Sequence, residues 1–260
     1  MSGMSSLHKD PDGVYTFTLS RPDAMNALNR ELVEDLMEAA NAVRSDPEAR
    51  AVIFVGLGDR AFSAGADLKE RAGLASVEVA EAVASISRAM QSVAEIPVPT
   101  IAAINGVALG GGFELALACD IRIASTTATM GLPETTLAII PGGGGTQRLP
   151  RIAGESRAKE LIFTGRRISA GDALQYGIVH EVAAPDELRM RAQAVARAIA
   201  SNGPVAVRAA KEAIVRGLAM PLEQGLALEQ EMYGRTVPTK DRLEGLEAFR
   251  EKRAPVYRGE

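Results

Sequence analysis

The chain opens with a strand-like pattern of hydrophobic and polar residues, and a helix-like pattern follows it. Residues 14–20 read VYTFTLS, and this alternation predicts a half-buried strand. Pro22 and Asp23 break the strand, and Asn29 is placed to cap a helix that runs to about Ser45. Apolar residues recur on one side of this helix at helical spacing. Acidic residues dominate its other side, which is expected to face solvent.

Two continuously apolar segments predict strands that are covered on both faces. They are residues 51–56 (AVIFVG) and 100–104 (TIAAI). Between them, the small and glycine residues of GLGDRAFSAGADLKE predict a loop that enters a helix near Asp67. Residues 76–94 are rich in alanine and have a helical period, and two prolines end that helix.

Residues 105–134 combine a turn, a glycine run and a new helix. Asn105 begins the turn, and three glycines at 110–112 come between a strand-like segment and a helix-like one. Another strand is expected from Asp120 to Ser125. The recurring order of strand, loop, strand and helix predicts a stack of β-β-α units.

From Ser156 onward the pattern becomes predominantly helical. Helix caps are expected at Ser169 and Asp186, and only Ile178 to Val182 has the pattern of a strand. Expected interruptions lie at Pro204, Pro221 and Pro238. The last helices carry many apolar residues for a terminal segment, which predicts docking on a neighbouring part of the chain or on another subunit.

Composition narrows the classes of function. Apolar residues make up 47% of the 260 residues, enough for a sizeable core, although length alone leaves open whether an appendage is attached. Aromatic residues account for only 4%, tryptophan is absent, and the formal net charge is −4. Nucleic-acid binding normally needs stacking aromatics and a basic surface, so no nucleic-acid partner is expected.

The single cysteine and the N-terminal residues bear on the compartment. Cys119 has no partner for an intrachain disulfide and lies in an apolar run, so a packed and inert thiol is expected. The N-terminal residues have neither the apolar core of a signal peptide nor the pattern of a transit peptide. The longest weakly polar run, Val98 to Phe113, is too short to span a bilayer. We therefore expect a soluble, cytoplasmic protein.

Several short motifs lack parts that their usual functions need. GLGDRA does not open the helix that would receive a dinucleotide pyrophosphate, and residues 142–145 are not followed by the lysine of a phosphate-binding loop. Turn or close-approach glycines are expected instead. Ser63 lies in a near match to a nucleophile elbow with His180 downstream, but a structural role for that histidine is favoured. Ligands at metal-binding spacing are missing, so no metal is expected.

Two glutamates are the strongest candidates for chemistry. Glu114 follows the glycines at 110–112, and Glu134 follows Pro133. Two carboxylates in one pocket repel each other, which raises at least one pKa and lets one act as an acid while the other acts as a base. Spacing alone leaves a structural alternative open, in which Glu114 caps its helix and Glu134 is a surface turn residue.

The glycines favour the catalytic interpretation. A helix start without side chains exposes backbone N–H groups that can bind a developing oxyanion. Ala66 follows Gly65 at another junction between a loop and a helix. It is a candidate for a second donor of this kind.

Three longer motifs resemble the crotonase family, also called the enoyl-CoA hydratase/isomerase family. They are AFSAGADLKE, PTIAAINGVALGGGFELALACDIRIAS and GLPETTLAIIPGGGGTQRL, within a similarity that covers nearly the whole chain from Val14. The ending PTKDRLEGLEAFREKRAPVYRGE is most similar to 3-methylglutaconyl-CoA hydratases. The resemblance implies an α/β fold, with a crotonase-like spiral of repeated β-β-α units over residues 1–200. It also implies a helical trimerisation region over residues 201–260 and a homotrimer or dimer of trimers.

The resemblance further implies an acyl-CoA substrate and no cofactor. The backbone N–H groups of Ala66 and Gly111 would hold the thioester oxygen. Glu114 would activate the water that adds at C3, and Glu134 would exchange the proton at C2. Other positions that the family pattern assigns to CoA or substrate binding are Ala24, Leu28, Ala64, Asp67, Leu68, Lys69 and Gly110. Candidate cations for the CoA phosphates are Arg21, Lys69, Arg71, Lys252 and Arg253.

Retention of both carboxylates favours a hydratase, a lyase that adds water to an enoyl-CoA. Double-bond isomerisation or thioester hydrolysis on the same scaffold remains open, as does a non-catalytic RNA-binding relative, although the acidic first helix argues against the last. The acyl tail is expected to face the helix around Leu74 to Ser87, Leu132, Ile140 and the C-terminal helices.

Overall fold

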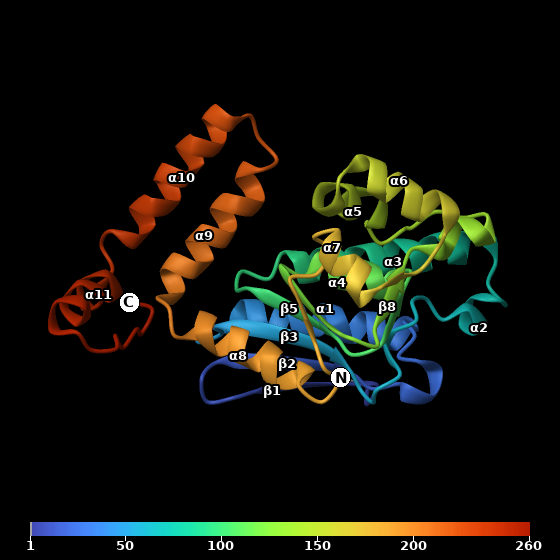
Figure 1. Ribbon diagram of the computed structural model, residues 1–260, viewed down its shortest axis with the longest axis horizontal. Helices are drawn as coiled ribbons and strands as arrows, with labels where there is room; N and C mark the ends of the chain where they lie inside the picture. Colours follow the sequence, from blue (N-terminus) through green and yellow to red (C-terminus); the bar gives the residue numbers. More distant parts are fainter. Residues whose placement is uncertain (1) are drawn as a thin grey trace.

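The computed structural model describes residues 2–260, which form two sheets surrounded by helices (Figure 1). The larger sheet has the strand order β1 (Ser5–Lys9), β2 (Val14–Leu19), β3 (Ala51–Gly56), β5 (Thr100–Ile104), β7 (Ile121–Ser125) and β10 (Glu181–Ala183). The smaller sheet has the order β4 (Ala61–Ser63), β6 (Val107–Leu109), β8 (Thr129–Gly131) and β9 (Ile168–Ser169). All neighbouring strands are parallel except β1 with β2 and β8 with β9.

Helices follow the strands in a regular order. In the first two thirds of the chain they are η1 (Pro22–Ala24), α1 (Arg30–Ser45), α2 (Leu68–Arg71), α3 (Ser76–Ala94), α4 (Gly111–Ala118), η2 (Pro133–Leu137), α5 (Gly145–Ala153) and α6 (Glu155–Thr164). The later helices are α7 (Ala170–Gln175), α8 (Leu188–Ala200), α9 (Pro204–Gly217), α10 (Leu222–Thr236) and α11 (Lys240–Glu251). The predicted cap of α1 is confirmed, because the Asn29 side chain accepts a hydrogen bond from the Leu32 amide.

Three successive units have the predicted β-β-α order. They are β3-β4-α3, β5-β6-α4 and β7-β8-α5, and in each the first strand joins the larger sheet while the second joins the smaller one. Because β3, β5 and β7 are parallel neighbours, and so are β4, β6 and β8, each unit advances the chain by one turn of a spiral. The predicted α/β spiral is therefore confirmed.

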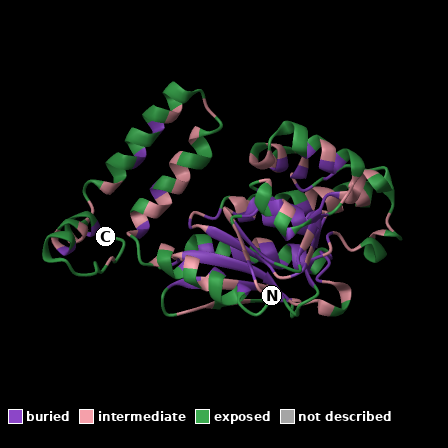
Figure 2. Cartoon of the chain, in the orientation of Figure 1, coloured by how far each residue is buried: buried purple, intermediate pink, exposed green. Residues whose placement is uncertain are grey.

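The larger sheet is buried on both faces, as predicted for the apolar strand at 51–56. Val52 and Phe54 of β3 face the core that contains α1, α3 and α4. Ile53 and Val55 alternate with them and pack on α8 at the opposite face. Figure 2 shows these strands as a buried layer between exposed helical surfaces.

Several sequence predictions need correction. The segment predicted as a loop before Asp67 contains β4, whose three residues are completed as a strand only by pairing with β6. The cap of α8 is Glu187 instead of Asp186, and the predicted strand from Ile178 to Val182 is the shorter β10. The cap at Ser169 is confirmed. Cys119 is buried as expected, and burial raises the pKa of its thiol to about 12.

The three C-terminal helices extend away from the sheets as an arm (Figure 1). Helix α9 packs on α10 through a small cluster of Ala209, Leu228 and Met232. Much of the remaining apolar surface of the arm is exposed, as Leu218 (85%) and Phe249 (87%) show. The division at residue 200 and the docking of these helices stay predictions. Among residues 2–260, no helix combines the length and apolar character needed to cross a membrane.

Candidate active site

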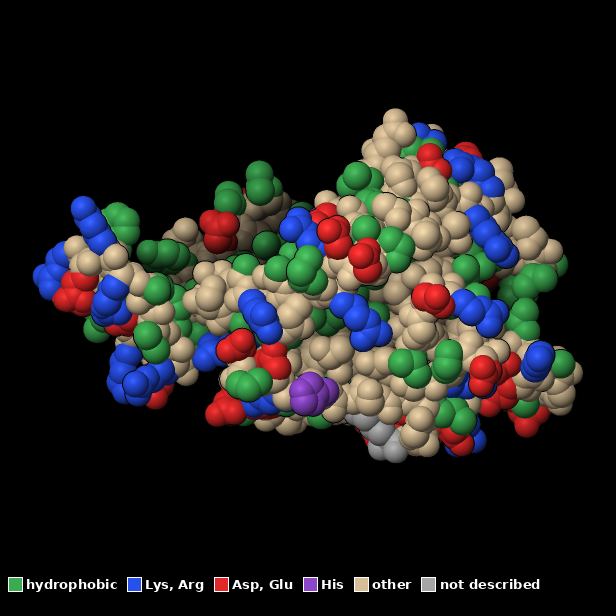
Figure 3. All heavy atoms as spheres, turned by 60° about the horizontal axis from the view of Figure 1, so that its bottom comes forward, with side chains coloured by type: hydrophobic (Ala, Val, Ile, Leu, Met, Phe, Trp, Pro, Cys, Tyr) green, Lys and Arg blue, Asp and Glu red, His purple; other side chains and the backbone are tan. Residues whose placement is uncertain are grey.

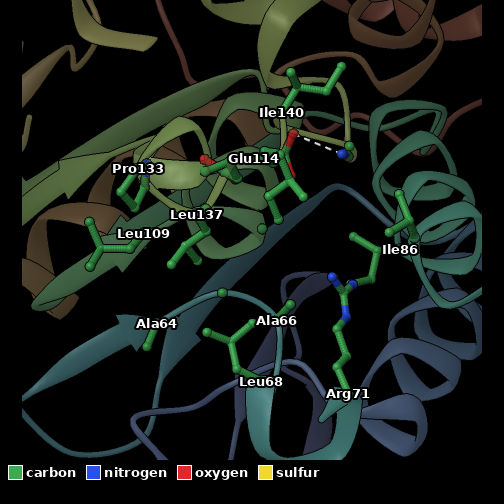
Figure 4. Close-up of a pocket in the computed structure, with 18 of the residues that line it drawn as sticks. Ala64, Ala66, Leu68, Arg71, Ile86, Leu109, Glu114, Pro133, Leu137 and Ile140 are labelled. Atoms are coloured by element: carbon green, nitrogen blue, oxygen red, sulfur yellow. Dashed lines mark hydrogen bonds between the residues drawn. The ribbon is translucent and has the colours of Figure 1, made fainter. Parts of the chain in front are cut away.

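A cavity of about 210 Å³ lies between the two carboxylates and the helices α2 and α3. Its charged lining residues are Arg71, Glu114 and Glu134. Its uncharged lining residues are Ala64, Gly65, Ala66, Leu68, Val79, Val83, Ile86, Leu109, Gly110, Gly111, Pro133, Leu137, Ile139, Ile140, Gly142 and Gly143. The cavity thus joins an apolar wall to a small set of charges, which is the usual composition of a small-molecule site. Figure 4 shows the labelled side chains around it.

Glu114 is held on α4 by the backbone of a distant loop. It is only 2% exposed, and its Oε1 accepts hydrogen bonds from the amides of Gly143 and Gly145, each at 2.8 Å. Burial raises the pKa of Glu114, and the two amides oppose that rise because they stabilise the charged form. Within residues 2–260 the Glu114 carboxylate accepts hydrogen bonds from this loop and none from α4, so the helix-capping alternative is wrong.

Glu134 enters the same cavity from η2. Its Oε2 is buried and has no hydrogen-bond partner among residues 2–260. Burial, together with the charge of Glu114, raises the pKa of Glu134 to about 7, although its own backbone N–H opposes the change. A carboxyl group with this pKa can give or take a proton near neutral pH. Glu134 lies in a helical turn, η2, but its side chain lines the cavity and its Oε2 is buried, so it is not the surface turn residue of the alternative interpretation.

Two backbone N–H groups line the cavity without a protein acceptor. Within residues 2–260, neither the Ala66 amide nor the Gly111 amide donates a hydrogen bond to the protein. A Cβ built on Gly111 would lie 3.7 Å from the Ala66 nitrogen, so the two groups are neighbours. Gly111 is the first residue of α4, where the helix leaves N–H groups free. The pair can bind an oxyanion.

A single β-bridge between Leu28 and Ala66 sets the direction of the Ala66 amide. The Leu28 amide donates to the Gly65 carbonyl at 2.7 Å, and the Asp67 amide donates to the Leu28 carbonyl at 3.0 Å. Because these two bonds flank Ala66, its own N–H points away from Leu28. The RPDAMNAL loop therefore positions an amide that lies far from it in the sequence.

Two of the three consecutive glycines are required by the backbone. Gly110 has φ of 51°, in the left-handed region that side chains disfavour. A Cβ on Gly112 would lie 2.1 Å from the Ser63 carbonyl oxygen, so α4 approaches β4 too closely for any side chain. The glycine run thus places the start of α4, and with it Glu114, directly against the smaller sheet.

The remaining predicted contacts divide into two groups. Ala64, Leu68 and Gly110 line the cavity. The others, Ala24, Leu28, Asp67 and Lys69, lie outside its lining. Ala24 ends η1, and Lys69 is exposed. Their roles in CoA binding stay predictions.

The predicted cations also differ in their surroundings. Arg21 pairs with Asp67 at 2.9 Å and donates to the Ala27 carbonyl, so it joins the two loops. Arg253 pairs with Glu244 and Glu251 in the C-terminal arm. Lys252 is exposed at the end of α11. Arg71 lines the cavity.

The residues predicted to face the acyl tail are only partly found there. Val79, Val83 and Ile86 of α3 line the cavity, as does Ile140. Leu132 is fully buried and lies outside the lining. The C-terminal helices contribute no lining residue within residues 2–260.

Sequence reasoning missed the role of the glycines at 142–145. Their pattern indicated a turn, yet two of their amides hold the Glu114 carboxylate. A Cβ on Gly143 would lie 2.6 Å from Oε2 of Glu114, so this position needs glycine. An available signal was a glycine run directly before a helix, since such a segment offers several free N–H groups to an anion.

A serine-histidine site is not assembled. Ser63 lies in β4, where its Oγ accepts a hydrogen bond from the Gly65 amide. His180 accepts one from the Arg122 amide beside the larger sheet, which confirms its structural role. No hydrogen bond joins the two side chains in the part of the chain that the structure describes, and no group of three or more possible metal ligands occurs there.

The chain is similar to known proteins over nearly its whole length. The model of a family described as enoyl-CoA hydratase/isomerase matches residues 9–260. A putative enoyl-CoA hydratase/isomerase, YngF, of Bacillus subtilis is 54% identical over 242 residues, which cover 93% of each chain. The human mitochondrial methylglutaconyl-CoA hydratase is 48% identical over 258 residues, 98% of this chain and 76% of the relative.

Solved structures agree with this similarity. The crystal structure of an enoyl-CoA hydratase from Bacillus anthracis matches with a TM-score of 0.97 and 52% sequence identity, over 99% of this chain and 100% of the other. The fold, the paired glutamates beside two free amides, and these matches together lead to one conclusion. The chain belongs to the enoyl-CoA hydratase/isomerase family, the crotonase family of enzymes, as its motifs predicted.

Proposed function

We propose that the protein is a hydro-lyase that adds water reversibly across the 2,3 double bond of an enoyl-CoA thioester. The observation that carries this proposal is the convergence of Glu114 and Glu134 on one cavity that the free amides of Ala66 and Gly111 also line. A thioester withdraws charge from a conjugated double bond, so C3 accepts water and negative charge develops on the thioester oxygen. Two N–H groups aimed at that oxygen stabilise the enolate.

The two glutamates carry out the two proton transfers of the reaction. Glu114, oriented by the amides of Gly143 and Gly145, takes a proton from the water that attacks C3. Glu134, with a pKa of about 7, is protonated in a large fraction of molecules at neutral pH and gives its proton to C2. The added hydroxyl and hydrogen together make up one water. After the addition Glu114 holds a proton and Glu134 has lost one, and proton exchange with solvent restores the starting protonation of the two carboxyl groups.

The test is an assay of crotonyl-CoA hydration. The loss of enoyl-thioester absorbance measures the rate, and mass spectrometry identifies the product. We expect a product heavier by one water, and we expect Glu114→Gln and Glu134→Gln each to lower kcat by about 100- to 10,000-fold. Asn41→Asp, an exposed change on α1, is the control and should leave kcat unchanged. A product of unchanged mass would indicate isomerisation, and release of free CoA would indicate hydrolysis. Either outcome contradicts the proposal.

For the acyl chain, we propose 3-methylglutaconyl-CoA as the preferred substrate. The similarity of the C-terminal motif and the 48% identity to proteins named methylglutaconyl-CoA hydratase support this choice. A screen of crotonyl-, long-chain enoyl- and 3-methylglutaconyl-CoA tests it. The highest kcat/KM should belong to 3-methylglutaconyl-CoA, and a preference for a long hydrocarbon chain would contradict it.

We also propose that α9, α10 and α11 assemble the chain into a homotrimer or a dimer of trimers. Exposed apolar side chains of the arm support this, since a free monomer would leave them in water. They include Ile214, Val215, Leu218, Leu222, Leu226, Leu243, Leu246 and Phe249. The expected absence of a nucleic-acid partner stays a prediction. Figure 3 shows acidic and basic side chains intermixed over the face in view.

The cytoplasmic location also stays a prediction. Some relatives, among them the human methylglutaconyl-CoA hydratase, are described as mitochondrial. Fractionation of cells that express the tagged chain would test the location directly. Recovery with an organelle would contradict the prediction.

A further inference from the structure

Arg71 is a charged group of the cavity to which the proposed hydration assigns no role. The reaction uses Glu114, Glu134 and two backbone amides. Every other lining residue in the described part of the chain is apolar or glycine, so Arg71 is the cation of this cavity. A positive charge placed among apolar walls needs an explanation.

The backbone of Arg71 is held firmly. It is the last residue of α2, and its amide donates to the Asp67 carbonyl at 3.2 Å. The Asp67 side chain caps α2 by accepting from the amides of Lys69 and Glu70. The same carboxylate pairs with Arg21, which fixes the helix to the RPDAMNAL loop. Figure 4 shows the Arg71 side chain reaching from this helix into the cavity, with its guanidinium toward Ile86 and Glu114.

The guanidinium has no anion of its own. Within residues 2–260, the Arg71 side chain makes no hydrogen bond, and no carboxylate lies within the 4.0 Å of an ion pair. Burial lowers its pKa, and the charges of Glu70 and Glu114 only partly offset this. The charge of Glu114 also acts on Arg148. The Arg148 guanidinium, however, donates to the Gly143 carbonyl at 2.9 Å and to the Gln91 side chain at 3.1 Å. Arg71 alone of these two therefore has its donors free.

We infer that Arg71 binds a carboxylate at the far end of the acyl chain, so that the substrate is the CoA thioester of a short unsaturated dicarboxylic acid. This inference rests on the proposed hydration and names the substrate class of the same site. A guanidinium binds a carboxylate through two parallel N–H···O bonds, which supplies the missing anion. The methylglutaconyl chain proposed above carries such a carboxylate.

The position of Arg71 favours the acyl tail over the CoA phosphates as its partner. Its guanidinium lies on the Glu114 side of the cavity beside Ile86, and Val83 also lines this cavity. The phosphates of CoA are separated from the thioester by the whole pantetheine arm and are strongly hydrated. An acyl chain that passes the two glutamates enters the cavity that Arg71 also lines.

The experiment compares crotonyl-CoA with glutaconyl-CoA, which differ by one carboxylate on C4. We expect Arg71→Met to lower kcat/KM for glutaconyl-CoA by about 10- to 100-fold, mainly through KM, because a charge-assisted hydrogen-bonded pair is lost. Crotonyl-CoA should change by less than about threefold, since it has no carboxylate to lose. Arg71→Lys should recover part of the activity with glutaconyl-CoA. Arg88→Met, which removes an exposed charge from α3, should affect neither substrate.

Three outcomes would overturn the inference. An equal loss with both substrates would mean that Arg71 acts through Glu114 or the CoA moiety. No loss with either would mean that it contacts no substrate. If the wild-type protein hydrates crotonyl-CoA but not glutaconyl-CoA, the inference fails while the proposed function stands. If it hydrates neither, the proposed function fails as well.

Discussion

A side chain at position 143 would collide with the carboxylate of Glu114. A Cβ built on Gly143 lies 2.6 Å from Oε2 and 3.0 Å from the carboxyl carbon of Glu114. The amide of the same glycine donates to Oε1 at 2.8 Å. One residue therefore both orients the carboxylate and leaves space for it.

We expect Gly143→Ala to lower kcat for hydration by about 100-fold, because the added methyl group displaces the Glu114 carboxylate from the attacking water. Steady-state kinetics with crotonyl-CoA measure this loss. Gly171→Ala is a matched control, since the nearest atom to a Cβ at position 171 is the Ser169 Oγ, 3.8 Å away. Equal activity of the two variants would show that the position of Glu114 does not limit the rate.

The pH dependence should report the raised pKa of Glu134. In the proposed hydration, protonated Glu134 delivers a proton to C2, and the pKa of that carboxyl group is about 7. Above this pKa, kcat/KM for hydration should fall by about tenfold per pH unit, with an apparent value that belongs to the coupled pair. Glu134→Gln should remove this alkaline limb from its residual activity. A rate that rises through pH 7 would contradict the assignment.

The contribution of Glu134 to stability should fall as pH rises, whereas most carboxyl groups contribute more stability at higher pH. The folded-state pKa of Glu134 is raised from 4.5 to about 7, so the folded state holds this proton more tightly than the unfolded state. The resulting stabilisation is present at low pH and is lost as pH rises through about 7. Thermal unfolding should therefore show that Glu134→Gln stabilises the protein more at pH 8 than at pH 5. An identical effect at both values would indicate that the pKa of Glu134 in the folded state is close to its value in the unfolded state.

Arg122 stabilises the end of the helix that carries Glu114. It is 4% exposed, and its guanidinium donates to the carbonyls of Ala116, Cys119 and Ile178. We expect Arg122→Met to cost about 2–4 kcal/mol in the free energy of unfolding, because buried carbonyls lose their donors. Denaturant unfolding measures the change.

The control for this variant is Arg191→Met, which breaks an exposed ion pair with Glu181 on the same sheet. That loss should be about 1 kcal/mol or less. If the two variants unfold at the same denaturant concentration, the buried network around Arg122 contributes little to stability.

Association through the C-terminal arm should depend on its exposed apolar residues. Phe249→Glu places a charge at a position that is 87% exposed in the single chain. We expect sedimentation to show a trimer or hexamer for the wild type and a smaller species for the variant, because burying an unpaired charge is costly. Met190→Glu on α8, at a position 61% exposed, should leave the mass unchanged. A wild-type monomer would contradict the proposed assembly.

Local sequence was sufficient for the elements whose signals lie within a few residues. Asn29 and the apolar stripe behind it predicted α1, and the unbroken apolar run at 51–56 predicted a strand covered on both faces. The motif around the glycines at 110–112 was long enough to predict the family and the spiral of β-β-α units. These predictions succeeded because capping, periodicity and close backbone packing act over short distances.

Short strands and helix caps were harder to predict. The strand β4 has three residues, and only its pairing with β6 makes it a strand. Asp186 has the side chain of a good cap, yet α8 begins after Glu187. In β4 the pairing outweighed local preference, since strand propensities differ by less than the energy of such contacts.

The assembly of the site was decided by the tertiary structure. The Gly143 amide donates to the carboxylate of Glu114, which lies 29 positions away in the sequence. The glycines at 142–145 had the pattern of an ordinary turn. Arg71, one of the candidate cations for the CoA phosphates, lines the cavity and has no ion-pair partner among residues 2–260. Residue types and spacing predicted which carboxylates carry chemistry. Only the spiral, which brings the starts of successive helices together, determined which amides and which charge surround them.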